Sequence, residues 1–272
     1  MSRHDGDYKA DLKLDVPAFD QSFDVVVHAA GKAHMVPRSE EESKDFYDTN
    51  VQGTQNLLTA LEAALPKAFI FISSVAVYGA DMGQDIAEDA PLLAKDPYGK
   101  SKIDAELLVT NWCEKNKVIC TVLRLPLLAG PNPPGNLASM IKGMQAGYYF
   151  NIAGGKAKKS VVLAEDVAKI IDKVSTLGGV YNLTDRYHPS FLELSALISR
   201  QLGKPAPRNI PNYIGVLMAK VGDLLGSRSP INTDKLKKIT ADLTFNDDKA
   251  VAAFEWKPLP VLQGFNIKEE AS

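Results

Sequence analysis

The stretch that decides the fold is Ala68-Phe-Ile-Phe-Ile-Ser-Ser74, an apolar run that ends in two hydroxyl side chains. A run of this length indicates a strand buried on both faces, as in a parallel sheet. Similar apolar runs occupy residues 24–28 and 118–125. Residues 44–65 and 98–117 have the spacing of apolar residues that is typical of a helix. Strands that alternate with helices predict an α/β fold, with a Rossmann-like parallel sheet covered by helices on both faces.

The carboxyl ends of the predicted strands carry polar or small residues. Ser73 and Ser74 end one strand, His28-Ala-Ala-Gly31 ends a second, and a segment rich in Pro and Gly begins at Pro126 after the third. Ligands of open parallel sheets bind outside the carboxyl ends of the strands. We therefore expect these three segments to line one crevice.

The bulk composition excludes several classes of protein. The chain has 272 residues, 45% hydrophobic and 24% charged, with a net charge of −2, so no basic surface predicts a nucleic-acid partner. The apolar run at residues 118–130 contains Arg124 and is too short to span a bilayer, so no membrane partner is expected. Cys113 and Cys120 form no metal-binding pattern, which predicts no metal site and fits a reducing, cytoplasmic location.

Tyr98 and Lys102 are four residues apart in the predicted helix at residues 98–117. This spacing places both side chains on one face, one turn apart. An ammonium beside a phenol favours the phenolate, so we expect Lys102 to lower the pKa of Tyr98 and to make it a base. Arg124 is left without a functional role, with a structural ion pair as the alternative.

Several motifs, in order along nearly the whole chain, together resemble the extended short-chain dehydrogenase/reductase family, and most of all its UDP-glucose 4-epimerase-like branch. This is the NAD-dependent epimerase/dehydratase group. The segments that carry the resemblance are His28-Ala-Ala-Gly31, Asn50-Val-Gln-Gly-Thr54, Ser73-Ser-Val-Ala-Val-Tyr-Gly79, Pro97-Tyr-Gly-Lys-Ser-Lys102, Leu123-Arg-Leu-Pro126, Gly135-Asn-Leu137 and Trp256-Lys-Pro258.

The resemblance implies an NAD-dependent nucleotide-sugar epimerase of the 4-epimerase type. In it Ser74 binds the substrate hydroxyl, Tyr98 is the general base, and Lys102 holds the nicotinamide ribose. The implied cofactor is NAD, with NADP not excluded, and the expected substrate is a UDP-sugar. The residues implied to bind the cofactor are Asp11, Leu12, Ala29, Ala30, Gly31, Asn50, Ser73, Tyr98, Lys102 and Pro126. Those implied to bind the substrate are Ser74, Val75, Asn136, Leu137 and Lys159.

The resemblance also implies how the chain is organised. Residues 1–131, with a contribution from 160–182, correspond to a partial Rossmann cofactor domain. Residues 132–272 correspond mainly to a smaller mixed α/β substrate-binding region. Homodimers formed through the helices at residues 44–65 and 98–117 are typical of the family, so a homodimer is a further expectation.

Two departures from the family pattern bear on activity. The 4,6-dehydratases carry acids after the strand-end hydroxyl, whereas Val75 and Ala76 stand here, which disfavours dehydration. The family also opens with a Gly-x-x-Gly-x-x-Gly turn for the cofactor diphosphate, whereas Gly6 is the only glycine before Gly31. We therefore expect the amino-terminal flank of the sheet to be missing and the strand at residues 24–28 to be an exposed edge.

Several interpretations remain open at this point. The chain is either an amino-terminally truncated epimerase, which the retention of Ser74, Tyr98 and Lys102 favours, or a short protein that has lost cofactor binding. Whether this chain is itself active is also open, because the glycine-rich turn for the cofactor is missing. The alternatives to epimerisation are an NAD(P)-dependent reductase or dehydrogenase of the same superfamily, and a non-enzymatic binding protein on a degenerate Rossmann scaffold.

Overall fold

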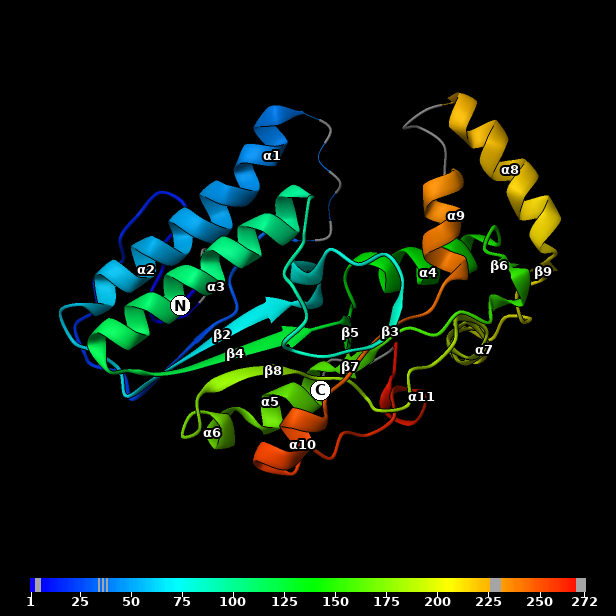
Figure 1. The fold of residues 1–272 in the computed structure, drawn as a ribbon. Helices are drawn as coiled ribbons and strands as arrows, with labels where there is room; N and C mark the ends of the chain where they lie inside the picture. The colour runs from blue at the N-terminus through cyan, green and yellow to red at the C-terminus, as the bar shows by residue number, and fades with distance from the viewer. Residues whose placement is uncertain (3–5, 34, 36, 38, 226–230, 268–272) are drawn as a thin grey trace.

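A four-stranded parallel sheet forms the centre of the computed structural model, which describes residues 1–2, 6–33, 35, 37, 39–225 and 231–267 (Figure 1). The strand order is β1-β2-β4-β8, with parallel pairing throughout. The strands are β1 (Val25–His28), β2 (Ala68–Ser74), β4 (Ile119–Leu125) and β8 (Gly179–Asn182). The predicted parallel sheet is thus confirmed.

Helices cover both faces of this sheet, as predicted (Figure 1). One face carries α1 (Glu40–Tyr47), α2 (Gly53–Leu61) and α3 (Pro97–Asn116), and the other carries α5 (Ala164–Lys169), α6 (Ile171–Val174) and α10 (Asp248–Phe254). Side chains alternate along β2 in the way a strand requires. Phe69 and Phe71 pack with Leu57, Leu58 and Val109 on the first face. Ile70 packs with Val167 and Phe254 on the second face.

The start of α3 is fixed by its own sequence. The side chain of Asp96 caps the helix by accepting a 3.0 Å hydrogen bond from the backbone N–H of Gly99. Pro97 occupies the first turn, where its missing N–H costs nothing. Tyr98 therefore stands in the first turn of the helix, at the end that faces the tip of β2.

The helical segment predicted at residues 44–65 is interrupted. A π-helical turn, η1 (Asp48–Gln52), lies between α1 and α2 and contains the buried Asn50. Such turns occur mostly as single bulges and often mark functional positions. Periodicity alone did not reveal it, because a π-turn shifts the helical spacing by a single residue.

The rest of the described chain adds short turns, two-stranded pairs and further helices. The 3₁₀ turns are η2 (Val75–Tyr78) and η3 (Ala153–Gly155). Three two-stranded pairs are β3 (Gly83–Ile86) with β10 (Leu243–Phe245), β5 (Leu127–Ala129) with β7 (Val161–Leu163), and β6 (Asn151–Ile152) with β9 (Asn209–Ile210). The remaining helices are α4 (Gly135–Ala146), α7 (Phe191–Gln201), α8 (Asn212–Leu225), α9 (Thr233–Thr240) and α11 (Val261–Gly264). Strands of two or three residues leave little periodic signal, which is why most of these pairs were not predicted.

Strand β1 is an edge of the four-stranded sheet, as expected. It pairs with β2, and no described strand lies on its other side. Val25 and Val27 are 38% and 43% exposed there. Among the described residues, no helix is long and apolar enough to cross a membrane.

Candidate active site

The segments expected to line the crevice stand at the carboxyl ends of three strands of the sheet. Ala29, Ala30 and Gly31 follow β1 and are exposed. Ser74 is the last residue of β2, and Pro126 follows β4; both are partly buried. Since the strands are parallel, these segments all lie at the same edge of the sheet.

Ser74 and Tyr98 meet at this edge. The Ser74 hydroxyl accepts a 3.2 Å hydrogen bond from the N–H of Ala76, which caps the short 3₁₀ turn η2. The nearby Ser74 hydroxyl lowers the pKa of Tyr98 by stabilising its phenolate. Burial has the larger effect and raises the pKa of Tyr98 above its usual value, and the charge of Asp96 acts in the same direction. The ring of Tyr98 lies 6.0 Å from that of the fully buried Phe46.

Lys102 is buried one turn further along α3. Its ammonium donates a 3.0 Å hydrogen bond to the carbonyl of Ile72 and lies 4.7 Å from the ring centroid of Phe71. Burial lowers the pKa of Lys102 to about 8, against the opposing charge of Glu106. The prediction that Lys102 lowers the pKa of Tyr98 is wrong for this structure, because the ammonium points to β2 and burial dominates the titration of Tyr98.

Asn50 joins the loop after β1 to α3. Its side-chain oxygen accepts a 2.6 Å hydrogen bond from the N–H of Lys32, and its amide donates to the carbonyl of Lys32 at 3.0 Å and to the hydroxyl of Ser101 at 2.9 Å. Gly31 lies against the same group. A Cβ at Gly31 would be 3.0 Å from Asn50 Oδ1 and 3.4 Å from Lys102 Nζ. The structure thus brings together Gly31, Asn50 and Lys102, three residues far apart in the sequence.

A buried ion pair lies next to Ser73 and was not predicted as a unit. The guanidinium of Arg124 forms a bidentate ion pair with the carboxylate of Glu106, with nitrogen–oxygen distances of 2.8 to 3.3 Å. Ser73 donates its hydroxyl to the same carboxylate. Glu106 could have been found from the sequence, since it follows Lys102 by one further turn of α3. The hydroxyl of Ser73, which was predicted to contact the cofactor, is therefore hydrogen-bonded to Glu106 in this structure.

Tyr78 completes this buried network. Its hydroxyl accepts a 3.0 Å hydrogen bond from Arg124 and donates one of 2.7 Å to the side chain of Asn182 on β8. Its ring stacks on that of Phe245. Burial raises the pKa of Tyr78 although Arg124 opposes this. The network links α3 to the strand ends on which Ser73 and Asn182 lie.

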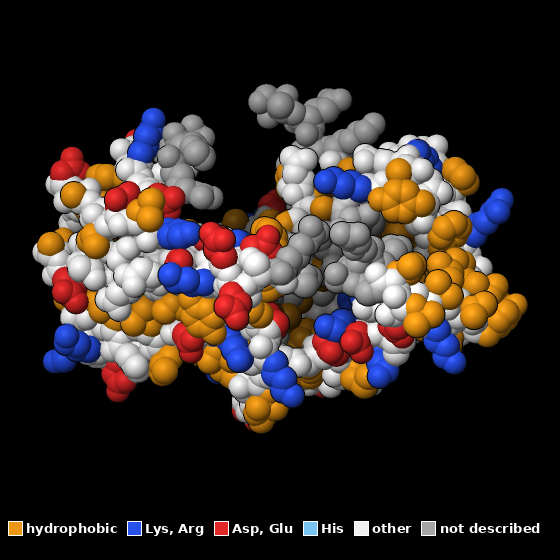
Figure 2. Space-filling model, turned by 90° about the horizontal axis from the view of Figure 1, so that it is seen from above, with side chains coloured by type: hydrophobic (Ala, Val, Ile, Leu, Met, Phe, Trp, Pro, Cys, Tyr) orange, Lys and Arg blue, Asp and Glu red, His pale blue; other side chains and the backbone are white. Residues whose placement is uncertain are grey.

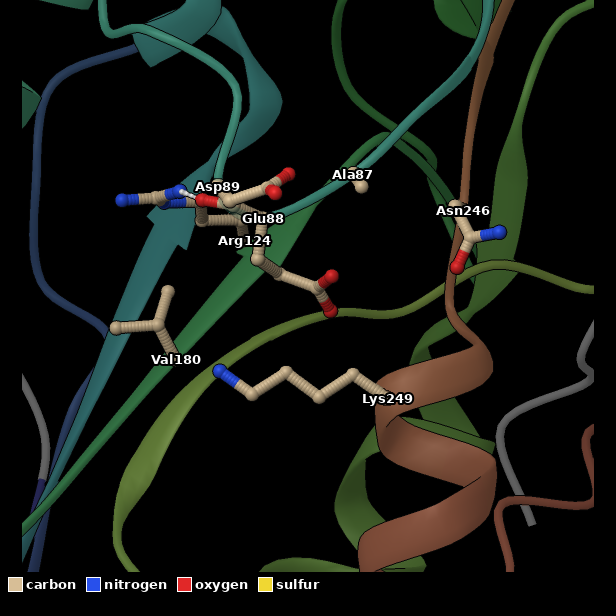
Figure 3. A pocket seen from close by; sticks show the side chains of 7 residues that line it. All are labelled: Ala87, Glu88, Asp89, Arg124, Val180, Asn246 and Lys249. Atoms are coloured by element: carbon tan, nitrogen blue, oxygen red, sulfur yellow. Dashed lines mark hydrogen bonds between the residues drawn. The ribbon is translucent and has the colours of Figure 1, made fainter.

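Arg124 also lines a groove of about 490 Å³ on the β8 side of the sheet (Figure 3). Its lining residues are Ala87, Glu88, Asp89, Arg124, Val180, Asn246 and Lys249. Arg124 donates a 3.0 Å hydrogen bond to the carbonyl of Glu88, and Lys249 extends from α10 across the opening (Figure 3). None of Ser74, Tyr98 and Lys102 lines this groove, so it is separate from the predicted crevice.

His28 is a packed residue and not a candidate base. Its Nε2 lies 2.9 Å from the hydroxyl of Thr54, and its ring packs near those of Phe69 and Phe71. Burial and the nearby charge of Lys102 lower the pKa of His28 to about 3. The imidazole is therefore neutral at physiological pH.

The remaining predicted residues have different surroundings. The carbonyl of Leu12 accepts a 2.8 Å hydrogen bond from Asn56 on α2, and Asp11 lies partly buried beside it. Val75 opens η2 and is partly buried. Asn136 is exposed in the first turn of α4, whereas the side chain of Leu137 is packed in a hydrophobic cluster. Only the backbone of Leu137 can therefore contact a ligand.

Lys159 is buried between α9 and α7. Its ammonium donates a 2.8 Å hydrogen bond to the carbonyl of Lys238 in the last turn of α9 and lies 6.0 Å from the ring of Phe191. Burial lowers the pKa of Lys159, against the opposing charges of Asp242 and Asp81. For the residues described, the structure contains no cluster of side chains suited to a metal ion.

The chain is similar in sequence to several known proteins. Residues 2–183 match the sequence model of the NAD dependent epimerase/dehydratase family. The chain is 29% identical over 232 residues to the N-acetyl-alpha-D-glucosaminyl-diphospho-ditrans,octacis-undecaprenol 4-epimerase of Escherichia coli O157:H7, covering 81% of this chain and 70% of that protein. It is 26% identical over 276 residues to a UDP-glucose 4-epimerase of Vibrio cholerae, covering 98% of this chain and 81% of that protein.

A solved structure gives the same result for the fold. The UDP-glucuronic acid 4-epimerase of Bacillus cereus, in complex with NAD, matches with a TM-score of 0.67 at 20% identity. The match covers 88% of this chain and 70% of that one. The Rossmann-like architecture predicted from the sequence is therefore confirmed.

Proposed function

The chain belongs to the NAD-dependent epimerase/dehydratase family, and within it we propose that the protein is a nucleotide-sugar 4-epimerase. The observation that carries the proposal is the effect of the Ser74 hydroxyl on the pKa of Tyr98 at the tip of β2, with Lys102 one turn further along α3 and Gly31 next to Lys102. Tyr98 is a proton acceptor close to the exposed loop that follows β1. Oxidation of a sugar hydroxyl requires such an acceptor at a place that the sugar can reach.

Tyr98 takes the hydroxyl proton in this proposal. Ser74 donates its one hydroxyl hydrogen to the sugar oxygen and so orients it next to Tyr98. The proton leaves the C4 hydroxyl for Tyr98 while the C4 hydrogen leaves as a hydride, which produces a 4-keto sugar. After the sugar turns over, the hydride returns to the opposite face of C4 and Tyr98 returns its proton to the C4 oxygen, which restores a hydroxyl of inverted configuration. Because burial raises the pKa of Tyr98, proton removal in this structure needs a further positive charge near the phenol.

NAD supplies the hydride acceptor and donor for such chemistry when it is bound. The residues after β1 fit its nicotinamide ribose. Gly31 has no side chain to fill the space next to Lys102 and Asn50, so Lys102 is positioned to hold a ribose hydroxyl and Asn50 fixes the loop. The sequence has no Gly-x-x-Gly-x-x-Gly turn, so we assign no residue to the diphosphate of the cofactor. Choice of NAD over NADP is part of the proposal and rests on the family.

The substrate we propose is a UDP-sugar. The relatives from Escherichia coli O157:H7 and Vibrio cholerae are both named as 4-epimerases, one of a sugar carried by undecaprenyl diphosphate and the other of UDP-glucose. A diphosphate is common to both, and Lys159 with the amino-terminal turn of α4 at Asn136 and Leu137 remains our proposal for its contacts. Lys159 would have to leave the carbonyl of Lys238 to reach it.

Dehydration is disfavoured by the surroundings of Tyr98. The turn that follows Ser74 is Val75-Ala-Val-Tyr78, which carries no acid. Asp96, which does act on Tyr98, is held by its capping bond to Gly99. We also propose that the protein forms a homodimer through α1, α2 and α3, with twice the 29.5 kDa mass of one chain in sedimentation experiments.

The test is to incubate the purified chain with NAD and, separately, with each of several UDP-sugars that have an equatorial or axial C4 hydroxyl. Proton NMR is expected to show conversion of either C4 epimer into a mixture of both, without net formation of NADH. Stoichiometric NADH would instead support the dehydrogenase alternative. No conversion and no NADH, in samples shown by calorimetry to bind NAD, would overturn the proposal.

A further inference from the structure

Helix α8 has its apolar side turned outward. Gly215, Ala219 and Gly222 are its buried residues, spaced so that they share one face. A Cβ at Gly215 would be 2.6 Å from the side chain of Ile152, so the helix packs closely against η3 and β6 with its smallest residues. A helix on the surface of a soluble domain normally presents its large apolar residues to the core.

The large apolar residues of α8 are exposed instead. Tyr213, Leu217 and Leu224 are 74%, 64% and 88% exposed. Together with Val221 they form a stripe at spacings of four, four and three residues, opposite the small residues. Ile214, Val216, Met218 and Leu225 widen the stripe. Figure 2 shows these hydrophobic side chains gathered at one end of the molecule.

Aromatic side chains extend this surface beyond the helix. Phe150 is exposed and directly precedes β6, which pairs with β9, the strand that leads into α8. Tyr148 is 66% exposed two residues earlier. A contiguous apolar surface of this kind on one chain marks a contact site.

Basic side chains lie along the margin of this apolar surface. Lys220 is on the flank of the stripe within α8, and Lys204 and Arg208 are exposed in the segment that leads into β9 and α8. Figure 2 shows Lys and Arg side chains around the hydrophobic group. The one acid within α8, Asp223, accepts a 2.9 Å hydrogen bond from the N–H of Thr233. Three cations, Lys204, Arg208 and Lys220, thus stand against this one acid, so the net charge of the margin is positive.

We propose that α8 and its aromatic neighbours, the α8 surface, bind the face of an anionic lipid bilayer. A helix with apolar residues on one side and lysine or arginine at its edges lies in the plane of a membrane interface, and anionic headgroups attract the basic margin. A second copy of the chain suits the surface less well, because two-fold pairing puts the same positive margin on both partners and offers neither an opposite charge.

The length of α8 fits this role. Fourteen residues make a helix about 21 Å long, too short to span a bilayer but enough to lie on one. The absence of a membrane-spanning segment led us to expect no membrane partner, and an interfacial helix revises that expectation. The proposal does not depend on the proposed function, because none of the α8 residues takes part in the Ser74, Tyr98 and Lys102 arrangement.

The test is flotation of the whole chain with vesicles of phosphatidylcholine alone or mixed in equal parts with phosphatidylglycerol. We expect binding to the mixed vesicles, weaker binding to the neutral ones, and loss of binding at high salt. The double variant Leu217→Gln and Leu224→Gln removes apolar contact without adding charge and is expected to bind more than about tenfold more weakly. The matched control is Leu14→Gln with Leu93→Gln, at leucines that are 74% and 63% exposed elsewhere.

A fluorescent variant gives an independent measurement. Trp112 and Trp256 are buried, at 7% and 3% exposed, so a tryptophan introduced by Leu224→Trp reports on α8. Its emission is expected to shift to the blue when mixed vesicles are added. Three results would overturn the proposal: no binding to either kind of vesicle, equal binding by the double variant and the wild type, or a wild-type dimer that becomes a monomer in the double variant. The last result would assign α8 to self-association.

Discussion

The side-chain amide of Asn50 donates a 2.9 Å hydrogen bond to the hydroxyl of Ser101, and this contact fixes the loop after β1 to the helix that carries Tyr98 and Lys102. Asn50 is 2% exposed, and its other bonds go to the backbone of Lys32. The buried amide therefore sets the distance between the loop at Gly31 and the ammonium of Lys102.

Asn50→Ala removes three hydrogen bonds from a buried position. The N–H of Lys32 loses its partner, so we expect the free energy of unfolding to fall by about 1–3 kcal/mol. Urea unfolding measures this loss. Gln52→Ala, a change of another amide on the same π-turn at an exposed position, is the control and is expected to have a small effect. A loss no larger for Asn50→Ala than for Gln52→Ala would contradict the role assigned to Asn50.

Glu106→Gln tests the ion pair beneath the site. The variant keeps the shape of the side chain but leaves the guanidinium of Arg124, which is 5% exposed, without an opposite charge. We expect it to reduce the free energy of unfolding by about 3–5 kcal/mol. Glu114→Gln, at an exposed position of the same helix, is the matched control.

Adding Arg124→Met to Glu106→Gln is expected to recover much of the lost stability, because no buried charge then remains. Urea denaturation of the single and double variants completes the comparison. If Glu106→Gln behaved like Glu114→Gln, the pair would not hold α3 to β4 in the way described.

Lys102→Met is expected to increase stability while abolishing turnover. The pKa of Lys102 is lowered to about 8 from 10.5, so the unfolded chain binds a proton that the folded chain does not between these values. The buried ammonium therefore costs stability below pH 8, by at most about 3 kcal/mol, and the cost disappears as the pH rises to 10.5. The gain from Lys102→Met, measured by thermal unfolding, should shrink over this range. A destabilised variant at pH 7 would disprove this, and Lys100→Met at an exposed position is the control.

We expect His28 to lower the free energy of unfolding in acid. Its pKa is lowered from 6.5 to about 3, so below pH 6.5 the unfolded chain takes up a proton that the folded chain does not. Stability therefore falls as the pH drops through this window, with a slope of up to about 1.4 kcal/mol per pH unit from this residue. His28→Gln keeps a partner for Thr54 and should flatten the slope, as measured by urea unfolding between pH 7 and pH 4.5. An unchanged slope would rule out His28 as its source.

The strands and helices that position the site were predictable because their signals are local. The run at residues 68–74 corresponds to β2 in full, and the spacing of Tyr98 and Lys102 correctly placed both on one face of α3. The partners of buried charges were not predictable, since they depend on contacts between distant segments. Arg124 was left without a role, and its pair with Glu106 appears only when β4 lies under α3.

The direction of the pKa of Tyr98 was predicted wrongly for the same reason. Spacing along a helix indicates that two side chains share a face, but it does not say which group the ammonium binds. Here the carbonyl of Ile72 and the ring of Phe71 on β2 hold the ammonium of Lys102. Burial, which no local pattern reports, then decides the titration of the phenol.

The most direct test of the central claim is the rate of C4 interconversion of a UDP-sugar by Tyr98→Phe, compared with the wild type, at saturating NAD. We expect the loss of the phenol oxygen to slow the reaction by at least about a hundredfold, with NAD affinity by calorimetry unchanged. Tyr47→Phe, at another partly buried tyrosine, is the control and should retain activity. Wild-type turnover in Tyr98→Phe would contradict the assignment of Tyr98 as the base and with it the proposed function.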